Sequence, residues 1–135
     1  MRLKGTCLLM CLVLMMSFVS VAYAEEGIMP CYSYTSSIAA SLSISGGVAK
    51  AAGKITPEDS QHTSITVRLQ RKSSSGTWST ISTWTGSNAG GKSEAGGTKS
   101  LASGYDYRVY VTGKVYNSTG TVIETIDKYS ATKSY

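Results

Sequence analysis

The stretch over residues 101–112 limits most strongly what this chain can fold into. Within it, tyrosine and valine alternate with polar residues, so two sets of side chains fall on opposite faces of an extended strand. One set is Tyr105, Tyr107, Val109 and Val111, and the other is Asp106, Arg108, Tyr110 and Thr112. This alternation predicts a β-strand with one buried face.

The start of this strand carries a second signal. Leu101, Gly104 and Tyr107 have the spacing of the tyrosine corner, so the stretch resembles immunoglobulin-like and fibronectin-III-like β-sandwiches. The resemblance implies that the Tyr107 hydroxyl group bonds to the backbone a few residues upstream. It also implies that residues 105–112 form strand F of such a sandwich.

Six other segments have the composition of strands and are separated by turn residues. They lie at residues 38–44, 48–55, 65–69, 77–84, 98–101 and 122–131. The Gly, Ser and Asn residues over 86–97 predict a loop, and those over 117–120 predict a turn. The sequence therefore predicts an all-β fold, a seven-strand antiparallel immunoglobulin-like β-sandwich.

A further resemblance concerns residues 68–72 and 76–81, which we expect to form a hairpin. These residues are similar to the C and C′ strands of many bacterial cell-surface immunoglobulin-like domains. Over residues 32–133, the pattern resembles small secreted one-domain proteins of Gram-positive bacteria that have no assigned activity. The chain lacks the cysteine pair between strands B and F that antibody domains have.

The N-terminal residues predict export. Arg2 and Lys4 precede an apolar run over residues 8–21, and Ala22 and Ala24 occupy the positions that signal peptidase inspects. The run is shorter than the roughly 20 residues needed to cross a bilayer. We therefore expect a secreted protein without a membrane span.

This processing would define three segments. Residues 1–24 are the expected signal peptide, residues 25–36 an N-terminal extension, and residues 37–135 the immunoglobulin-like β-sandwich. A lipoprotein signal that ends at Cys11 is the alternative, although the bulky Met10 precedes that cysteine.

Cleavage would also change the charge and the cysteine content. The formal net charge would fall from +5 to +3, because Arg2 and Lys4 are both basic. The remaining basic residues are scattered rather than clustered, so we expect no nucleic-acid partner. Cys31 would be the one remaining cysteine, either as a free thiol or in an intermolecular disulfide.

Several motifs have a chemical interpretation that their context does not favour. Residues 86–93 satisfy the phosphate-binding loop pattern, but the glycines that follow oppose the helix which that loop requires. His62 is the one histidine, and its neighbours predict a polar turn. Asn117 begins a glycosylation sequon, but the same residues also predict a turn. We expect no catalytic residues, no cofactor and no metal, and hence no enzyme.

The candidate binding residues come from the expected strand over 77–84. Trp78 and Trp84 share one face of a regular strand, and Ile81 lies on the other. If Ile81 points inward, both tryptophans face outward and form a candidate ligand-binding surface. The outward residues of strands C and F would join them there, namely Arg68, Arg108 and Tyr110. The alternative is that one or both tryptophans close the core, or that a β-bulge resets the alternation.

Two functions of different classes fit these features. The first is a secreted, non-enzymatic binding or adhesion module that recognises an extracellular glycan, cell wall or protein through strands C′, C, F and G. The alternative is a small secreted structural or signalling protein, such as an effector, that acts through its loops. A contiguous aromatic surface on the sheet would favour the first, and a face of Ser and Thr the second.

The expected export gives a direct prediction: the secreted protein begins at Glu25, because Ala22 and Ala24 satisfy the small-residue positions. Mass spectrometry of the secreted protein should find Glu25 as its first residue. A secreted form that retains Met1, or one acylated at Cys11, would contradict the processing.

Overall fold

The computed structural model describes residues 31–135, of which Tyr32–Tyr135 form one compact unit. The expected signal peptide and most of the expected N-terminal extension lie outside the described residues. The strands are β1 (Thr35–Ser45), β2 (Val48–Pro57), β3 (His62–Lys72), β4 (Trp78–Asn88), β5 (Ser93–Ser100), β6 (Asp106–Tyr116), β7 (Val122–Tyr129) and β8 (Lys133–Ser134).

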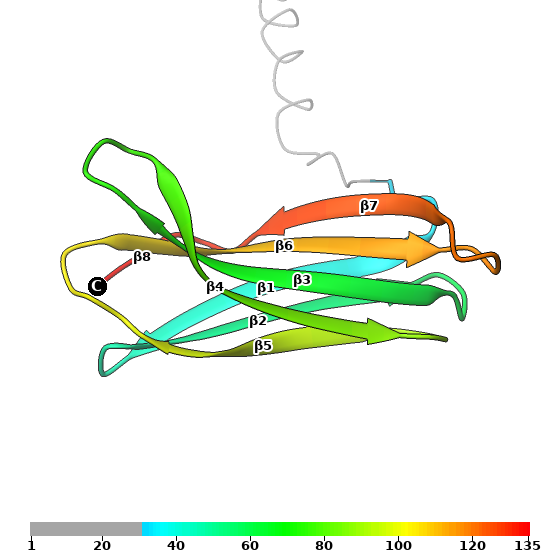
Figure 1. The fold of residues 1–135 in the computed structure, drawn as a ribbon, viewed down its shortest axis with the longest axis horizontal. Coiled ribbons are helices and arrows are strands. Elements are labelled where there is room, and N and C mark those ends of the chain that lie inside the picture. Colours follow the sequence, from blue (N-terminus) through cyan, green and yellow to red (C-terminus); the bar gives the residue numbers. More distant parts are fainter. Residues whose placement is uncertain (1–30) are drawn as a thin grey trace, which may run out of the picture. The chain divides into compact units, whose positions relative to one another are not determined.

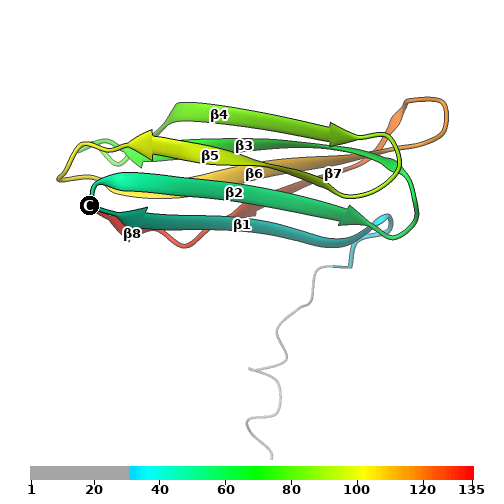
Figure 2. The same ribbon diagram turned by 90° about the horizontal axis from the view of Figure 1, so that it is seen from below.

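The strands form two antiparallel sheets that pack against each other (Figures 1 and 2). One sheet has the order β1-β2-β5, and the other has the order β4-β3-β6-β7, with β8 paired to β6. The all-β sandwich predicted from the sequence is therefore confirmed, with β8 as a short eighth strand. The expected strands C′, C, F and G are β4, β3, β6 and β7, in that order across one sheet.

Alternation along the strands places the core between the sheets. The fully or almost fully buried apolar residues are Leu42, Ala49, Ala51, Ile55, Ile65, Val67, Leu69, Tyr107, Val109, Val111, Val115 and Ile126. In β2 the inward residues are small, and a Cβ atom added to Gly53 would lie 2.6 Å from Val67 and 2.8 Å from Val111. The small side chains of β2 thus let the two sheets approach closely, as expected from the sequence.

The loop predicted over residues 86–97 is wrong. β4 continues to Asn88 and β5 begins at Ser93, so only the residues between them form a turn. The glycines of β5 lie at close approaches rather than in a flexible loop. A Cβ atom on Gly96 would overlap the backbone of Ala51, and one on Gly97 would overlap the indole of Trp84.

A buried pair of hydroxyl groups links the two sheets beside this turn. Thr63 of β3 and Ser93 of β5 lie 2.7 Å apart through their side-chain oxygens, and both residues are buried. Ser93 also donates to the backbone oxygen of Thr63 at 3.0 Å, and Thr63 donates to the backbone oxygen of Gly91. Buried hydroxyl groups are costly without partners, so this arrangement fixes how β5 packs against β3.

The tyrosine corner is present. Tyr107 is fully buried, and its hydroxyl group donates to the backbone oxygen of Ala102 at 2.6 Å. Tyr105, expected on the same buried face, is 37% exposed and precedes β6. Its ring lies 4.6 Å from the guanidinium carbon of Arg71, at the end of the sandwich.

The first strand begins at Thr35, inside the segment that we expected to be an extension. Glu124 of β7 attaches the chain there: its carboxylate accepts hydrogen bonds from Ser33 N at 2.8 Å, Tyr34 N at 3.1 Å and the Thr35 hydroxyl group at 2.7 Å. Residues 33–35 are thereby tied to β7.

The corner bond gives a stability prediction. Tyr107→Phe should lower the free energy of unfolding by about 1 kcal/mol or more, because the ring remains but its bond to the Ala102 carbonyl, which is partly buried, is lost. Urea melts of the exported protein measure the change. Tyr105→Phe is the matched control and should melt like the wild type, since its exposed hydroxyl group has no bond within residues 31–135. Equal melts for both variants would remove the Tyr107 bond from any role in stability.

Candidate functional site

The outward side of the β4-β3-β6-β7 sheet, called the outer face below, carries a row of large polar and aromatic side chains. A bulge in β4 decides which residues reach it. Leu69 pairs with Ser82 and the next residue, Gln70, pairs with Thr80, so Ile81 is an extra residue without a partner. The alternation of β4 is reset at this position.

The bulge separates the two tryptophans. Trp78 pairs with the outward residue Lys72, whereas Trp84 pairs with the buried residue Val67 and packs against the core. The structure therefore places Trp84 on the inner side, which is the alternative that the sequence left open, and removes it from the candidate binding surface. Ile81 also packs against the core. In a regular strand Ile81 and Trp84 would face opposite sides, and the extra residue at the bulge lets both of them point inward.

The other four candidate residues do come together on the outer face. Arg108 lies over the Trp78 ring at 4.2 Å and over the Tyr129 ring at 4.4 Å. Tyr129 stacks on Tyr110 with a centroid distance of 4.6 Å and an angle of 10°, and Arg68 lies 5.0 Å from the Tyr110 ring. Lys72 extends this row at the Trp78 end, with Nζ 5.9 Å from the Trp78 ring. We call these residues the ladder: Lys72, Trp78, Arg108, Tyr129, Tyr110 and Arg68.

Hydrogen bonds hold both arginines of the ladder in place. Arg108 Nε donates to Gln70 Oε1 at 2.8 Å, and Gln70 is itself buried beneath the ladder side chains. Arg68 donates to the Thr112 hydroxyl group at 3.0 Å, which in turn donates to Asp127 at 2.8 Å. The cationic groups are thus ordered both by rings and by polar partners.

A shallow polar hollow continues the outer face beyond the ladder. It has a volume of about 460 Å³, and its hydroxyl-bearing lining comes from β4, β3 and β6. The hydroxyl groups belong to Ser64, Thr66, Thr85, Ser87, Thr112 and Tyr116. The outer face therefore has an aromatic, cationic half and a hydroxyl-rich half.

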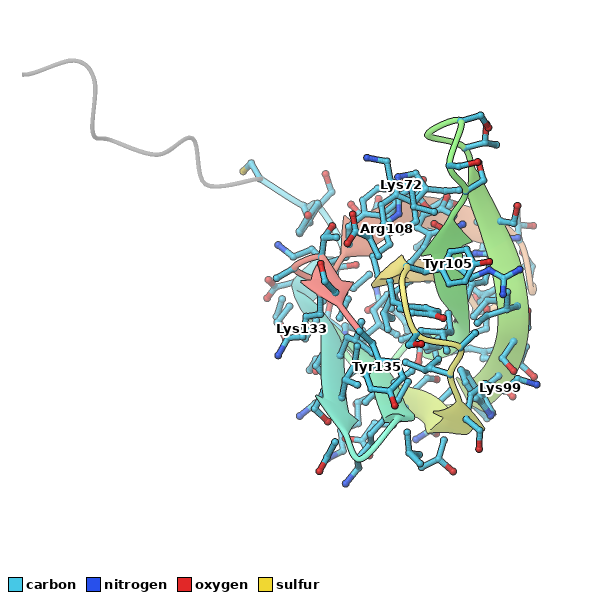
Figure 3. The ribbon with its side chains drawn as sticks, turned by 90° about the vertical axis from the view of Figure 1, so that its left-hand side faces the viewer. Lys72, Lys99, Tyr105, Arg108, Lys133 and Tyr135 are labelled. Carbon is cyan, nitrogen blue, oxygen red and sulfur yellow. The ribbon has the colours of Figure 1, made fainter. Side chains whose placement is uncertain are left out.

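A second hollow lies at the end of the sandwich. Its volume is about 600 Å³, and the β3–β4 turn (residues 73–76), Tyr105 and Tyr135 line it. Figure 3 faces this end and shows Tyr105 and Tyr135 over the gap between the layers, with Lys72 and Arg108 at the rim of the outer face. Lys72 is shared between this hollow and the ladder.

The motifs that we set aside have structural partners. Ser93, the serine of the phosphate-loop pattern, is buried and bonded to Thr63, so it is not free to bind a magnesium ion. The His62 ring stacks on Tyr116 at 4.7 Å. The Asn117 side-chain oxygen accepts from the backbone of Thr119 and Thr121, at 3.0 and 2.9 Å, which is the geometry of a turn.

The described residues offer few candidates for a membrane span, a metal site or a disulfide. Between residues 31 and 135 no helix is long and apolar enough to cross a bilayer. In that same range, no group of three or more His, Cys, Asp or Glu residues is placed to hold a metal ion. Cys31 is exposed and carries no disulfide.

Comparison with known proteins does not assign the chain to a family. No protein-family model matches the sequence, and no curated protein matches it.

Sequence reasoning missed three residues of the outer face. Tyr129 is the central ring of the ladder, Lys72 extends it, and Gln70 supports it from below. The spacing of Arg68, Gln70 and Lys72 along β3 contained a signal, because alternate residues share one face. Tyr129 depends on its pairing with Tyr110 across β6 and β7, which no local pattern reveals.

The separation of the tryptophans gives a second stability prediction. Trp84→Ser should lower the free energy of unfolding by about 3 kcal/mol, the low end for buried tryptophan, because the ring is only partly buried. Trp78→Ser should cost about 1 kcal/mol, since it removes mainly exposed cation–π contacts. Urea melts of the two variants provide the comparison. A larger loss for Trp78→Ser than for Trp84→Ser would place the bulge elsewhere in β4.

Proposed function

We propose that the chain is a secreted, non-enzymatic binding or adhesion module. It recognises an extracellular glycan, cell wall or protein through the outer face of β4, β3, β6 and β7. In this proposal it belongs with the small secreted immunoglobulin-like proteins of Gram-positive bacteria that its sequence resembles. The observation that carries the proposal is the ladder, a contiguous row of three rings and three cations on one exposed sheet.

The ladder has the properties of a recognition surface. Aromatic rings provide large rigid areas that stack on sugar rings or on protein side chains, and arginine adds directed hydrogen bonds. The ring of Tyr129 sits at the centre of the row and the residue is 48% exposed. Arg108 and Tyr110 lie against the faces of this ring, so a ligand gains apolar contact at its exposed edge, without any rearrangement of the core.

The loop-based alternative has less support. A contiguous aromatic surface on the sheet favours binding through the sheet and a face of Ser and Thr favours the loops; the outer face has the ladder on one half and hydroxyl groups on the other, and the ladder supports the first. The most attractive loop, residues 86–97, consists mostly of paired strand and is tied down through Ser93. The hydroxyl-rich hollow and the end hollow remain as polar surfaces beside the ladder.

A binding screen tests the proposal. The exported protein is applied to a glycan array and used in pull-downs from extracellular extracts, beside Tyr129→Ser and Tyr34→Ser. Tyr34 is the matched control, because it is 41% exposed and lies outside the ladder. Removal of a central aromatic anchor should weaken binding by about 2 kcal/mol, or roughly thirtyfold, whereas the control should bind like the wild type. Targets that bind Tyr129→Ser as well as the wild type would contradict the outer face as the binding surface.

A further inference from the structure

Arg108 is the best-ordered cation of the outer face. Its guanidinium group lies between two rings that come from the two edge strands of the sheet, Trp78 of β4 and Tyr129 of β7. The rings cover the flat sides of the group, and Gln70 engages Nε. A guanidinium held this way loses little further freedom when it binds a ligand.

The remaining nitrogens of Arg108 are available. A guanidinium has five N–H donors, and within residues 31–135 only the Nε donor of Arg108 has a partner. No side-chain nitrogen or oxygen in this range is both buried and unpaired, so the two Nη groups reach solvent. Two parallel N–H groups at the edge of a guanidinium match the two oxygens of a carboxylate.

The charges around Arg108 favour an anion. Arg68 and Lys72 are the other two cations of the ladder. Lys72 shares the Trp78 ring with Arg108, whereas Arg68 lies two rings away, beyond Tyr129 and Tyr110. Within residues 31–135 none of these three cations forms a salt bridge, and the Thr112 hydroxyl group stands between Arg68 and the carboxylate of Asp127. The ladder is therefore a strip of three cations without a direct carboxylate partner among the described residues.

The second half of the outer face suits sugar hydroxyl groups. Along β3 and β6, the ladder pair Arg68 and Tyr110 is followed by Thr66 and Thr112, and then by Ser64 and Lys114. From Arg108 to Lys114 the strand advances about 20 Å. An extended polymer can thus place charged groups on the ladder and hydroxyl groups over the hollow lined by Ser64, Thr66 and Thr112.

We infer that Arg108 is an oxyanion subsite, and that the ligand of the outer face is an acidic polysaccharide whose carboxylates bind there while its hydroxyl groups lie over the hollow lined by Ser64, Thr66 and Thr112. This inference rests on the proposed function and specifies its ligand. Charge complementarity and ordered donors support it over a neutral glycan, which would leave the two parallel N–H donors of Arg108 without an anionic partner.

The test uses polygalacturonate, its fully methyl-esterified form and polyglutamate as probes. The ester has the same sugar backbone without the charge, and polyglutamate has carboxylates without sugars. The exported protein is compared with Arg108→Gln, Arg108→Lys and Arg71→Gln by affinity electrophoresis and calorimetry. Arg71→Gln is the matched control, because it also removes one charge and one arginine–tyrosine stack but lies outside the ladder.

We expect the wild type to bind polygalacturonate, and to bind the ester and polyglutamate at least about tenfold more weakly. Both Arg108 variants should lose at least about tenfold in affinity, since lysine keeps the charge but not the fork. Arg71→Gln should stay within about twofold of the wild type. Undiminished binding by Arg108→Lys would show that the two parallel N–H donors of Arg108 do not bind the carboxylate, which overturns the oxyanion subsite. Equal binding of polyglutamate would overturn a polysaccharide ligand.

A readout on the unmutated protein covers the case in which an Arg108 variant fails to fold. Trigalacturonate is titrated into the ¹⁵N-labelled exported protein, and the Arg108 Nε–Hε resonance is followed by NMR. A saturable shift of this resonance, larger than that of Arg71, is expected. A resonance that does not move means that Arg108 only braces the sheet, and overturns the inference.

The screen above separates this inference from the proposed function. If polygalacturonate does not bind but another target is lost in Tyr129→Ser, the acidic polysaccharide is overturned and the binding face is retained. If every target found also binds Tyr129→Ser, both are overturned.

Discussion

The bulge at Ile81 is the constraint on which the outer face depends. A regular β4 would put Trp78 and Trp84 on one side of the sheet, and either the core or the ladder would lose its tryptophan. One unpaired residue lets Trp84 fill the core beside Gly97 while Trp78 covers Arg108. Bulges often re-aim a side chain in this way, and here the same extra residue serves stability on one side and the exposed row of rings on the other.

The ladder is ordered because each of its two arginines contacts a ring and also has a polar partner. Arg108 has Trp78, Tyr129 and Gln70, and Arg68 has Tyr110 and Thr112. Exposed cation–π contacts contribute only about 0.5–1 kcal/mol each, so the row adds modestly to stability. Its larger effect is to hold flexible side chains in one arrangement, which lowers the entropy lost when they meet a ligand.

Local patterns in the sequence were sufficient where burial alone decides the structure. Alternation located β3 and β6, and the spacing of Leu101, Gly104 and Tyr107 located the corner whose hydroxyl group bonds to Ala102. They were insufficient where distant strands meet. The glycines of β5 predicted a loop, yet the strand requires them because Ala51 lies against Gly96 and Trp84 lies against Gly97. The bulge and the Tyr110–Tyr129 stack likewise depend on register between strands, which composition does not encode.

The three hydrogen bonds of Glu124 have a practical consequence for where this domain begins. β7 pairs only with β6 along its length, so it is an edge strand, and edge strands attract other chains when left open. Residues 33–35 are fastened beside it by one carboxylate. A protein expressed from residue 37, the boundary that the sequence pattern suggests, would leave Glu124 without its three donors and β7 without this attachment to the start of the chain. Instability of such a truncated form would then report a badly chosen boundary rather than an unstable sandwich.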